Sequence, residues 1–404
     1  MDCIPYTYLF KAITMNFENI RKETLGLENT IHFNNAGSSL PPKCVTDTVV
    51  NYLVQEAQVG GYELYESEVN RLEFVYDQIS QLINANREEI ALMESATRAW
   101  TSLFYSLEWK KGQVILTSQT DYASNFISYL QIQKEKGIIL EVLPQSKHGE
   151  ICLESLENRL QKGDVKLVSL SHIPTNGGLI QPVEKVGSLT QKYNCLFLLD
   201  ACQSVGQCPT DVQKIQCDFL TATGRKYLRG PRGTGFLYVK KKHFSWLTPC
   251  SLDLFSANLT SKNSYEVRQD ARMFESWESS PALRLGLGEA CEYAYKLGVE
   301  KTFEKIKQLG NLLRKELQQV KGIEVHDLGK EKGGIVSFDL KDKDSLKVKK
   351  ELSQRKVNVS VSYKTSTFFD MEERGLGDIL RASVHYYNTE KEVLSFVEIL
   401  KGLP

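Results

Sequence analysis

Lys226 is the residue with the clearest chemical potential in this sequence, because its amine comes at the end of an apolar segment. Residues 219 to 222 (Phe-Leu-Thr-Ala) have the pattern of a short buried strand, and Thr-Gly-Arg interrupts it just before the lysine. Residues 236 to 239 (Phe-Leu-Tyr-Val) resume as the next buried strand. A lysine between core strands loses hydration, which lowers its pKa and makes it a nucleophile towards a carbonyl.

The alternative is that this lysine belongs to a solvated basic loop or to a phosphate-binding patch for nucleic acid. The basic residues concerned are Arg225, Lys226, Arg229 and Arg232. Lysine plus arginine equal aspartate plus glutamate at 50 each, so the chain has no global positive field. This balance disfavours nucleic acid and an anionic membrane as partners.

Polar residues follow several other apolar strands, at positions where a parallel sheet binds ligands. Asp200 ends a run of five apolar residues, and a buried carboxylate needs a cationic or donor partner. Tyr122 could stack on a planar cofactor, although simple packing also explains an aromatic ring there. In the turn at 171–178, Thr175 or Asn176 could donate to a ligand oxygen.

The segment at residues 94–104 places small and hydroxylated residues between a strand and a helical pattern. Free amide groups at such a helix start bind phosphate, and Ser95 or Thr97 can add a hydroxyl donor. A plain N-cap without a ligand explains the same residues, so the phosphate site depends on the rest of the chain.

These candidates are connected by an alternation of strands and helices. Continuous apolar strands separated by amphipathic helices indicate an α/β fold with a mostly parallel sheet covered on both faces. The strands are predicted at residues 88–93, 113–117, 138–143, 166–170, 195–200, 219–222 and 236–239, and helical patterns at 45–85 and 283–320.

The length of 404 residues, with 41% hydrophobic and 25% charged residues, predicts two domains. Residues 1–30 form an N-terminal segment, of which 1–14 are a possible extension ahead of Met15. Residues 31–282 form the large domain, and 283–404 form a linking helix and a small α+β domain. Its strands are predicted at residues 323–326, 334–340 and 357–362.

Nine cysteines are scattered without a zinc-ligand spacing or a small disulfide framework, which favours a reducing compartment and no metal site. No apolar stretch has the length of a membrane span, and the opening Met1-Asp2 lacks the basic residues of a signal peptide. We therefore predict a cytoplasmic protein without a membrane partner.

The sequence lacks a Gly-x-Gly-x-x-Gly fingerprint and a phosphate loop, which disfavours nicotinamide and nucleotide enzymes. A planar, phosphorylated cofactor with an aldehyde fits the polar positions better. Pyridoxal 5′-phosphate requires a lysine for a Schiff base and an acid at its pyridinium nitrogen. Lys226 and Asp200 supply this pair.

The motifs Leu-Asp200-Ala-Cys-Gln203-Ser, Thr223-Gly-Arg-Lys226 and Gly-Pro-Arg-Gly-Thr-Gly-Phe-Leu-Tyr-Val together resemble those of the class V aminotransferase group. This group of fold-type I pyridoxal phosphate enzymes includes cysteine desulfurases, selenocysteine lyase, isopenicillin N epimerase-like enzymes and C–S lyases. The resemblance covers roughly residues 31 to 400. It implies a large pyridoxal phosphate-binding domain and a small C-terminal domain.

The resemblance also implies the roles of individual residues. Lys226 would form the Schiff base, Asp200 would pair with the pyridine nitrogen, and Gln203 would hydrogen-bond the phenolic oxygen. Arg225 stands where many relatives have histidine, but a guanidinium can also hold phosphate. The implied phosphate ligands are Thr97 with the amides around Ala96, Thr223 and Arg225; Tyr122 matches the ring-stacking position, and the alignment does not decide between Thr175 and Asn176.

Near the C-terminus, Arg381 matches the arginine that binds the substrate α-carboxylate in this group. Its planar fork suits bidentate recognition of a carboxylate, whereas a lone arginine would more often be a surface charge. In relatives, the segment matching residues 272–281 lies near the active site of the partner subunit. The resemblance therefore implies a homodimer that acts on a small amino-acid substrate.

Desulfurases carry a cysteine shortly before this arginine, on a mobile loop, and it accepts sulfur as a persulfide. The present chain has a comparable loop at residues 363–374, but no cysteine after Cys291. We therefore expect a C–S lyase that performs β-elimination on a cysteine-derived substrate. A class V aminotransferase or an amino-acid epimerase would use the same residues, and a non-catalytic nucleic-acid-binding protein is a more distant alternative.

Overall fold

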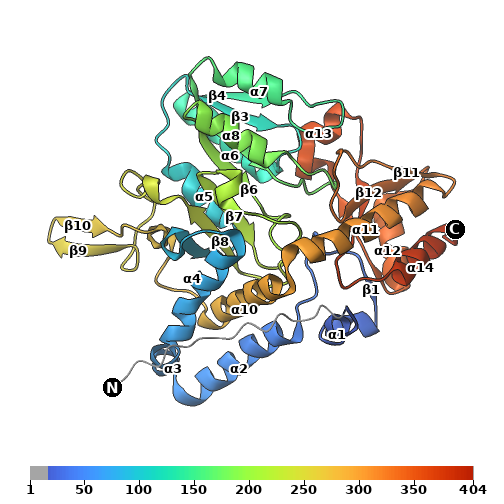
Figure 1. Cartoon of the computed structure of the whole chain (residues 1–404), viewed down its shortest axis with the longest axis horizontal. Helices are drawn as coiled ribbons and strands as arrows, with labels where there is room; N and C mark the ends of the chain where they lie inside the picture. Colours follow the sequence, from blue (N-terminus) through green and yellow to red (C-terminus); the bar gives the residue numbers. More distant parts are fainter. Residues whose placement is uncertain (1–16, 404) are drawn as a thin grey trace.

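The computed structural model describes residues 17–403, and its centre is a seven-stranded sheet with the order β2-β8-β7-β6-β5-β3-β4 (Figure 1). Neighbouring strands are parallel except that β8 is antiparallel to both β7 and β2. All seven strands lie within two residues of the predicted positions. They are β2 (Ile90–Met93), β3 (Val114–Ser118), β4 (Ile139–Leu143), β5 (Val165–Ser171), β6 (Leu196–Asp200), β7 (Phe219–Thr223) and β8 (Gly235–Val239).

Both faces of this sheet are buried, as the continuous apolar strands predict. Along β6, Phe197 and Leu199 belong to one hydrophobic core and Leu198 to the other, because successive side chains of a strand point to opposite faces. The fold is therefore a three-layer α/β arrangement. The helices that pack on it include α4 (Val69–Ile83), α5 (Ala96–Ser106), α6 (Ala123–Lys136), α7 (Leu153–Leu160), α8 (Val183–Lys192) and α10 (Pro281–Leu297).

Both long helical patterns are interrupted, the first at Gly60 and at Glu68 and the second at Gly298. The pattern predicted at 45–85 is divided into α2 (Lys43–Val59), α3 (Gly61–Ser67) and α4, and the pattern at 283–320 into α10 and α11 (Val299–Gln318). Gly60 and Gly298 have φ angles of 103° and 80°, which side chains with a Cβ rarely adopt. The apolar spacing continues across both glycines, so periodicity alone did not reveal these breaks.

The C-terminal region contains an antiparallel four-stranded sheet with the order β11-β12-β15-β14. Its own hydrophobic core includes side chains of α11, α12 (Ser345–Gln354) and α14 (Glu390–Lys401). The boundary predicted between residues 282 and 283 stays a prediction. The strands of this sheet are β11 (Ile323–Val325), β12 (Ile335–Leu340), β14 (Ser360–Ser362) and β15 (Ile379–Ser383).

Two C-terminal segments differ from the prediction. The strand predicted at 357–362 is two strands, because β13 (Val357–Asn358) pairs with β1 (Ile31–His32) while β14 pairs with β15. The loop at 363–374 contains a 3₁₀ turn, Lys364–Thr367, and the helix α13 (Phe368–Glu373). The beginning of the predicted large domain is thus hydrogen-bonded to the C-terminal region.

The remaining elements include α1 (Phe17–Lys22), α9 (Val212–Ile215) and the hairpin of β9 (Ala257–Ser261) and β10 (Ser264–Val267). The hairpin projects from the body of the molecule at the left of Figure 1. The possible extension at residues 1–14 lies outside the described residues. Between residues 17 and 403, no helix combines the length and the apolar composition needed to cross a bilayer.

Candidate functional site

One pocket, at the carboxyl ends of β5, β6 and β7, brings most of the predicted site residues together. Asn176, Thr223 and Arg381 are the predicted residues that do not line it. The pocket also contains residues that the sequence did not single out for the site. The lining residues are Ala96, Thr97, Trp100, Tyr122, Asn125, Ser171, Ile173, Thr175, Asp200, Cys202, Gln203, Arg225 and Lys226.

Lys226 lies in a closed turn between β7 and β8. The amide of Arg229 donates to the carbonyl of Lys226 at 2.9 Å, and the amide of Gly230 donates to the carbonyl of Gly224 at 2.7 Å. Arg229 has a left-handed φ of 64°, which reverses the chain after the lysine. The turn therefore fixes the backbone of Lys226 while its partly exposed side chain lines the pocket.

Asp200 is a buried carboxylate with no lysine or arginine within 4.0 Å in the described part of the chain. The amide of Cys202 donates to Oδ1 at 2.9 Å, and Asn125 Nδ2 lies 3.5 Å from Oδ2. Burial, followed by repulsion from Asp121, raises the pKa of Asp200 to about 6. A cationic nitrogen placed here would relieve both effects.

A second buried acid, Asp121, supports the first and was not recognised in the sequence. Asn125 donates to Asp121 Oδ1 at 3.2 Å and also approaches Asp200, so it links the two carboxylates. Burial raises the pKa of Asp121 despite its hydrogen bonds. Its other side-chain donors are Ser171 Oγ, Tyr129 Oη and Thr117 Oγ1. The i, i+4 spacing of Asp121 and Asn125 after a strand was a weak signal for this network.

The structure separates Thr175 from Asn176. Thr175 lines the pocket, and both its carbonyl and its hydroxyl accept hydrogen bonds from Arg381 Nη1 at 2.8 Å. Asn176 Nδ2 instead donates to Asp370 Oδ2 of α13 at 2.7 Å. Thr175 is therefore the member of the pair whose side chain is available to a ligand in the pocket.

Arg381 is buried on β15, next to the pocket wall. Its Nε atom has no hydrogen-bond partner, and no carboxylate of the described residues lies within 4.0 Å of its guanidinium. Burial lowers its pKa to about 10, so the group remains positively charged at neutral pH. A buried cation with an unpaired donor is suited to bind a ligand carboxylate.

The loop that follows β1 braces two pocket residues. Gln203 Nε2 donates to the carbonyl of Ala36 at 3.1 Å, and Arg225 Nη1 donates to the carbonyl of Gly37 at 2.6 Å. Gln203 Oε1 is buried without a partner. Thr223 does not line the pocket, and its hydroxyl donates to the carbonyl of Thr234 at 3.2 Å.

The first turn of α5 forms the opposite wall of the pocket, through Ala96 and Thr97. Ser95 caps this helix, because its hydroxyl accepts from the amide of Arg98 at 3.1 Å. A Cβ at Gly235 would lie 3.0 Å from the amide nitrogen of Ala96, so this position requires close backbone packing. The free amides of the helix start and Arg225 thus line the same pocket.

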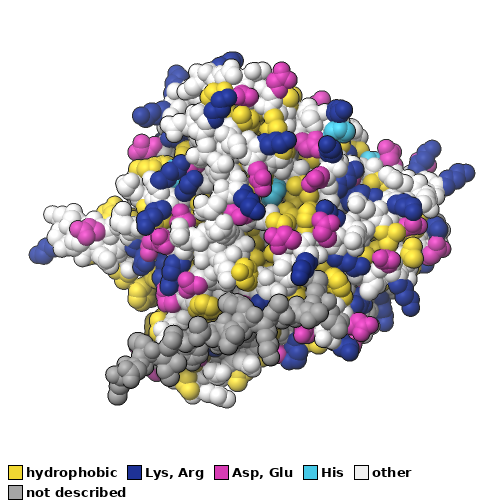
Figure 2. All heavy atoms as spheres, viewed as in Figure 1, with side chains coloured by type: hydrophobic (Ala, Val, Ile, Leu, Met, Phe, Trp, Pro, Cys, Tyr) yellow, Lys and Arg dark blue, Asp and Glu magenta, His cyan; other side chains and the backbone are white. Residues whose placement is uncertain are grey.

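The arginines around Lys226 do not form one basic surface. Arg229 is only 1% exposed; its guanidinium donates to Thr24 and Tyr386 and lies 4.7 Å from the ring centroid of Tyr387. Arg232 is exposed, and Arg225 lines the pocket. On the face shown in Figure 2, basic and acidic side chains are interspersed. The nucleic-acid alternative therefore has no concentrated basic patch in this loop.

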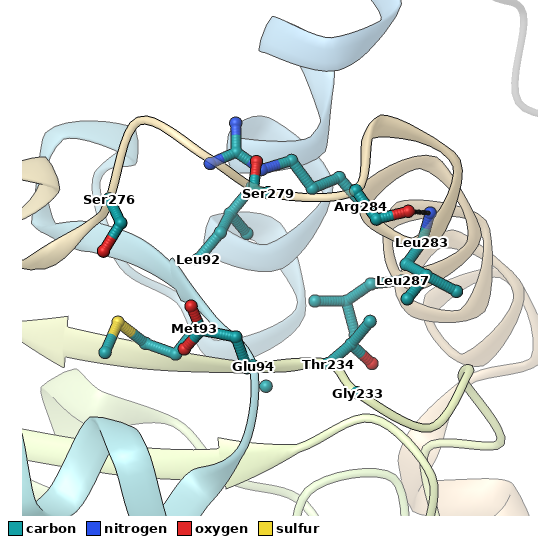
Figure 3. A pocket seen from close by; sticks show the side chains of 12 residues that line it. Leu92, Met93, Glu94, Gly233, Thr234, Ser276, Ser279, Leu283, Arg284 and Leu287 are labelled. Atoms are coloured by element: carbon teal, nitrogen blue, oxygen red, sulfur yellow. Dashed lines mark hydrogen bonds between the residues drawn. The ribbon is translucent and has the colours of Figure 1, made fainter. Parts of the chain in front are cut away.

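A second pocket is lined by Glu94, which comes two residues before Ala96 of the first pocket. Figure 3 shows Leu283, Arg284 and Leu287 of α10 on one side of it, and Met93 of β2 with the following Glu94 on the other. Serines of the segment at 272–281 complete its lining. They are Ser276, Ser279 and Ser280, of which Ser280 caps α10.

Comparison with known proteins finds relatives and solved structures that match nearly the whole length of the chain. A probable cysteine desulfurase of Pyrococcus abyssi is 28% identical over 395 residues, which cover 96% of this chain and 97% of the relative. A cysteine desulfurase of Thermococcus onnurineus has a TM-score of 0.89 and 23% identity, covering 97% of this chain and 98% of the other. A cystine C–S lyase, solved with its product cysteine persulfide, has a TM-score of 0.84 and 20% identity, covering 94% and 99%.

The family model described as aminotransferase class-V matches residues 31–396, which is nearly the whole chain. The likeness to the solved structures confirms the predicted fold-type I architecture. The chain belongs to the class V aminotransferase family, and it is accordingly a pyridoxal 5′-phosphate-dependent enzyme.

Proposed function

We propose that this enzyme is a C–S lyase, which performs β-elimination on a cysteine-derived amino acid. The observation that carries this proposal is the segment that precedes Arg381, because it contains no thiol and is bound to the rest of the protein. The carboxylate of Asp370 accepts hydrogen bonds from Asn176 at 2.7 Å and from Arg374 at 3.0 Å. Phe369 also stacks on Phe126 of α6, with 4.1 Å between the ring centroids.

The remaining cysteines do not replace the missing persulfide acceptor. Among the described residues, Cys202 is the one cysteine that lines the Lys226 pocket. Its amide is bonded to Asp200, and burial raises the pKa of its thiol. Cys202 is thus poorly suited to act as a thiolate nucleophile, which favours release of the sulfur product over its transfer to the enzyme.

The side chains of the pocket fit pyridoxal 5′-phosphate. Among the described residues, Asp200 has no lysine or arginine within 4.0 Å and Gln203 Oε1 has no hydrogen-bond partner, and the start of α5 lies across the pocket from Lys226. Lys226 would hold the cofactor covalently. Asp200 would contact the ring nitrogen, and Gln203 and Thr175 would contact the phenolic oxygen. Tyr122 would contact the ring face, and the phosphate ligands would be the Ala96 amide, Thr97 and Arg225. Thr223 is left out of this set because its hydroxyl donates to the carbonyl of Thr234.

When bound, the cofactor supplies an electron sink for the charge that develops at the substrate α-carbon. Arg381 binds the α-carboxylate and so orients the α-proton towards Lys226. The ε-amine of Lys226 removes this proton as a general base and can return it to the departing sulfur. Asp200 keeps a proton on the ring nitrogen through its negative charge, and Asn125 holds this carboxylate in place.

The proposed reaction is tested by incubating the holoenzyme with L-cystine and S-substituted L-cysteines without a 2-oxo acid. We expect equal amounts of pyruvate and ammonia, measured by coupled enzymatic assays. An absolute requirement for a 2-oxo acid acceptor would assign an aminotransferase instead. Loss of optical activity without pyruvate would assign an epimerase.

We further propose a cytoplasmic homodimer. Val50, Leu53 and Val54 have the i, i+3, i+4 spacing of one helix face, and all three are exposed on α2, which suits contact with a second copy. The described cysteines are all free, which suits a reducing compartment. Light scattering should give twice the chain mass of 45.9 kDa, and a mass of one chain would contradict the dimer.

The raised pKa of Asp200 predicts a pH-dependent stability of the enzyme without its cofactor. Since the folded-state pKa of about 6 exceeds the ordinary value of 3.8, the carboxylate favours folding below pH 3.8 and loses this contribution as the pH rises through 6. Asp200→Asn removes the buried charge. At pH 7.5 we expect the apo variant to be more stable than the apo wild type by on the order of 2 kcal/mol.

Urea unfolding followed by circular dichroism measures this difference at pH 4 and at pH 7.5. The advantage of Asp200→Asn should shrink towards pH 4 and reverse in the holoenzyme, where Asp200 has a cationic partner. Half-exposed Asp47, which pairs with Lys43 on the surface of α2, provides the control Asp47→Asn. An equal effect of Asp200→Asn at both pH values would contradict the assigned cause.

A further inference from the structure

Three metal-binding side chains converge at one edge of the four-stranded sheet. Glu324 and His326 come from β11 and the residue that follows it, and Asp339 comes from β12. One ligand atom of each residue lies within 4.8 Å of the other two. None of the three lines the Lys226 pocket, so the cluster has no part in the function proposed above.

His326 and Asp339 are close together but are not hydrogen-bonded. His326 Nε2 lies 3.0 Å from Asp339 Oδ2, while the side chain is 7% exposed and Nε2 has no hydrogen-bond partner in the described part of the chain. The distance between the two atoms suits a hydrogen bond, so the angle between the two groups is what prevents one. The two atoms point past one another, and a third atom could bind both. Zinc bonds of about 2.0 to 2.2 Å at a tetrahedral angle place two ligands of one ion about 3.3 to 3.6 Å apart, slightly more than the 3.0 Å between these two atoms.

The negative charges of the Glu324 and Asp339 carboxylates also lack a neighbouring lysine or arginine among the described residues. The antiparallel register places these two residues directly opposite each other, and like charges at such positions destabilise a sheet. Within residues 17–403, neither carboxylate has a lysine or arginine within 4.0 Å, and the His326 ring is the basic group that lies within this distance of Asp339. A bound cation would remove this repulsion.

We propose that Glu324, His326 and Asp339 bind one divalent transition-metal ion, and that Zn²⁺ is the ion that fits best. An imidazole favours zinc, copper, iron and nickel over magnesium or calcium, and the two carboxylates supply oxygen ligands. Glu324 is exposed, so water can complete the coordination. The ion fastens the edge strand β11 to β12.

This position connects the ion to the substrate side of the enzyme through the sheet. The amide of His326 donates to the carbonyl of Ser337, and Ser337 is paired with Arg381 across β12 and β15. The carbonyl of His326 also accepts a hydrogen bond from Arg374, which follows α13. By fixing His326, the ion thus stabilises the residue to which both Ser337 and Arg374 are hydrogen-bonded.

The test is calorimetric titration of the EDTA-treated, dialysed holoenzyme with ZnCl₂. The wild type should bind one more zinc ion per chain than His326→Asn, and Asp339→Asn and Glu324→Gln should weaken this site by at least about tenfold. The control is Glu398→Gln, which alters an exposed carboxylate paired with Lys401 and should bind as the wild type. Variants with wild-type circular dichroism in EDTA are compared.

Free cysteines can also bind zinc. The difference in zinc stoichiometry between the wild type and the cluster variants distinguishes such binding from binding at this site. Equal stoichiometry in the wild type and His326→Asn would show binding elsewhere only, and would overturn the proposal. Absence of binding to the wild type at millimolar zinc would overturn it too. A zinc-induced rise in melting temperature that is present in the wild type and lost in all three cluster variants would support it.

Discussion

Lys226→Ala is expected to abolish covalent attachment of pyridoxal 5′-phosphate and to lower kcat by about 10⁴-fold or more. The physical reason is that one amine has two tasks, as the covalent anchor of the cofactor and as the base for the α-proton. The closed turn at 224–230 places no second lysine in the pocket. Borohydride reduction followed by mass spectrometry should label Lys226 in the wild type and leave the variant unlabelled.

A lysine of α9, Lys214, provides the matched control because its side chain is exposed and does not line the pocket. Lys214→Ala should retain the label and the activity. Added methylamine should restore part of the lost rate in Lys226→Ala, since a small amine can replace the missing base. Full activity of Lys226→Ala, or a borohydride label on another residue, would contradict the assignment.

The architecture of the large sheet could be predicted because each strand carries its own signal. A strand buried on both faces is continuously apolar, and the polar residue that ends it marks the ligand-binding edge. Asp200 and Lys226 were found for this reason, since Asp200 ends β6 and Lys226 comes three residues after β7. The pairing of β1 with β13 was not found, because it joins segments more than 300 residues apart and β1 has only two residues.

Side-chain direction was the main obstacle within the site. Thr175 and Asn176 are adjacent and both polar, yet one contacts Arg381 and the other contacts Asp370 of α13. Both partners lie about two hundred residues away, so no local pattern distinguishes the two residues. The same limit applies to Asp121, which follows β3 and reaches Asp200 of β6 through Asn125, although β5 lies between the two strands.

Arg229 illustrates a related failure of local reasoning. In the sequence it belongs to a run of basic residues, which is typical of a solvated loop. In the structure it is buried, and it donates to Thr24, Leu40 and Tyr386, which come from three distant segments. Its charge is therefore used to fix the turn of Lys226 against those segments. Local charge composition could not reveal this use, because it depends on long-range packing.

The second large effect is expected at Arg381, whose replacement by leucine should lower kcat/KM for amino-acid substrates by about 10² to 10³-fold. Arg381 is buried, and residues 17–403 offer it no carboxylate partner and no hydrogen-bond acceptor for its Nε atom. The substrate carboxylate would therefore provide its missing counter-charge, and leucine cannot. Most of the loss should appear in KM, measured by steady-state pyruvate release.

Matched substrates separate this role from a general structural defect. The carboxamide of the same substrate carries no negative charge, so Arg381→Leu should change its kcat/KM by less than about threefold. Arg381→Lys keeps a cation but loses the planar fork, and it should fall between the wild type and leucine for the carboxylate. An equal loss for carboxylate and carboxamide, with the cofactor still bound, would show that Arg381 supports the fold around Thr175 and does not bind the substrate.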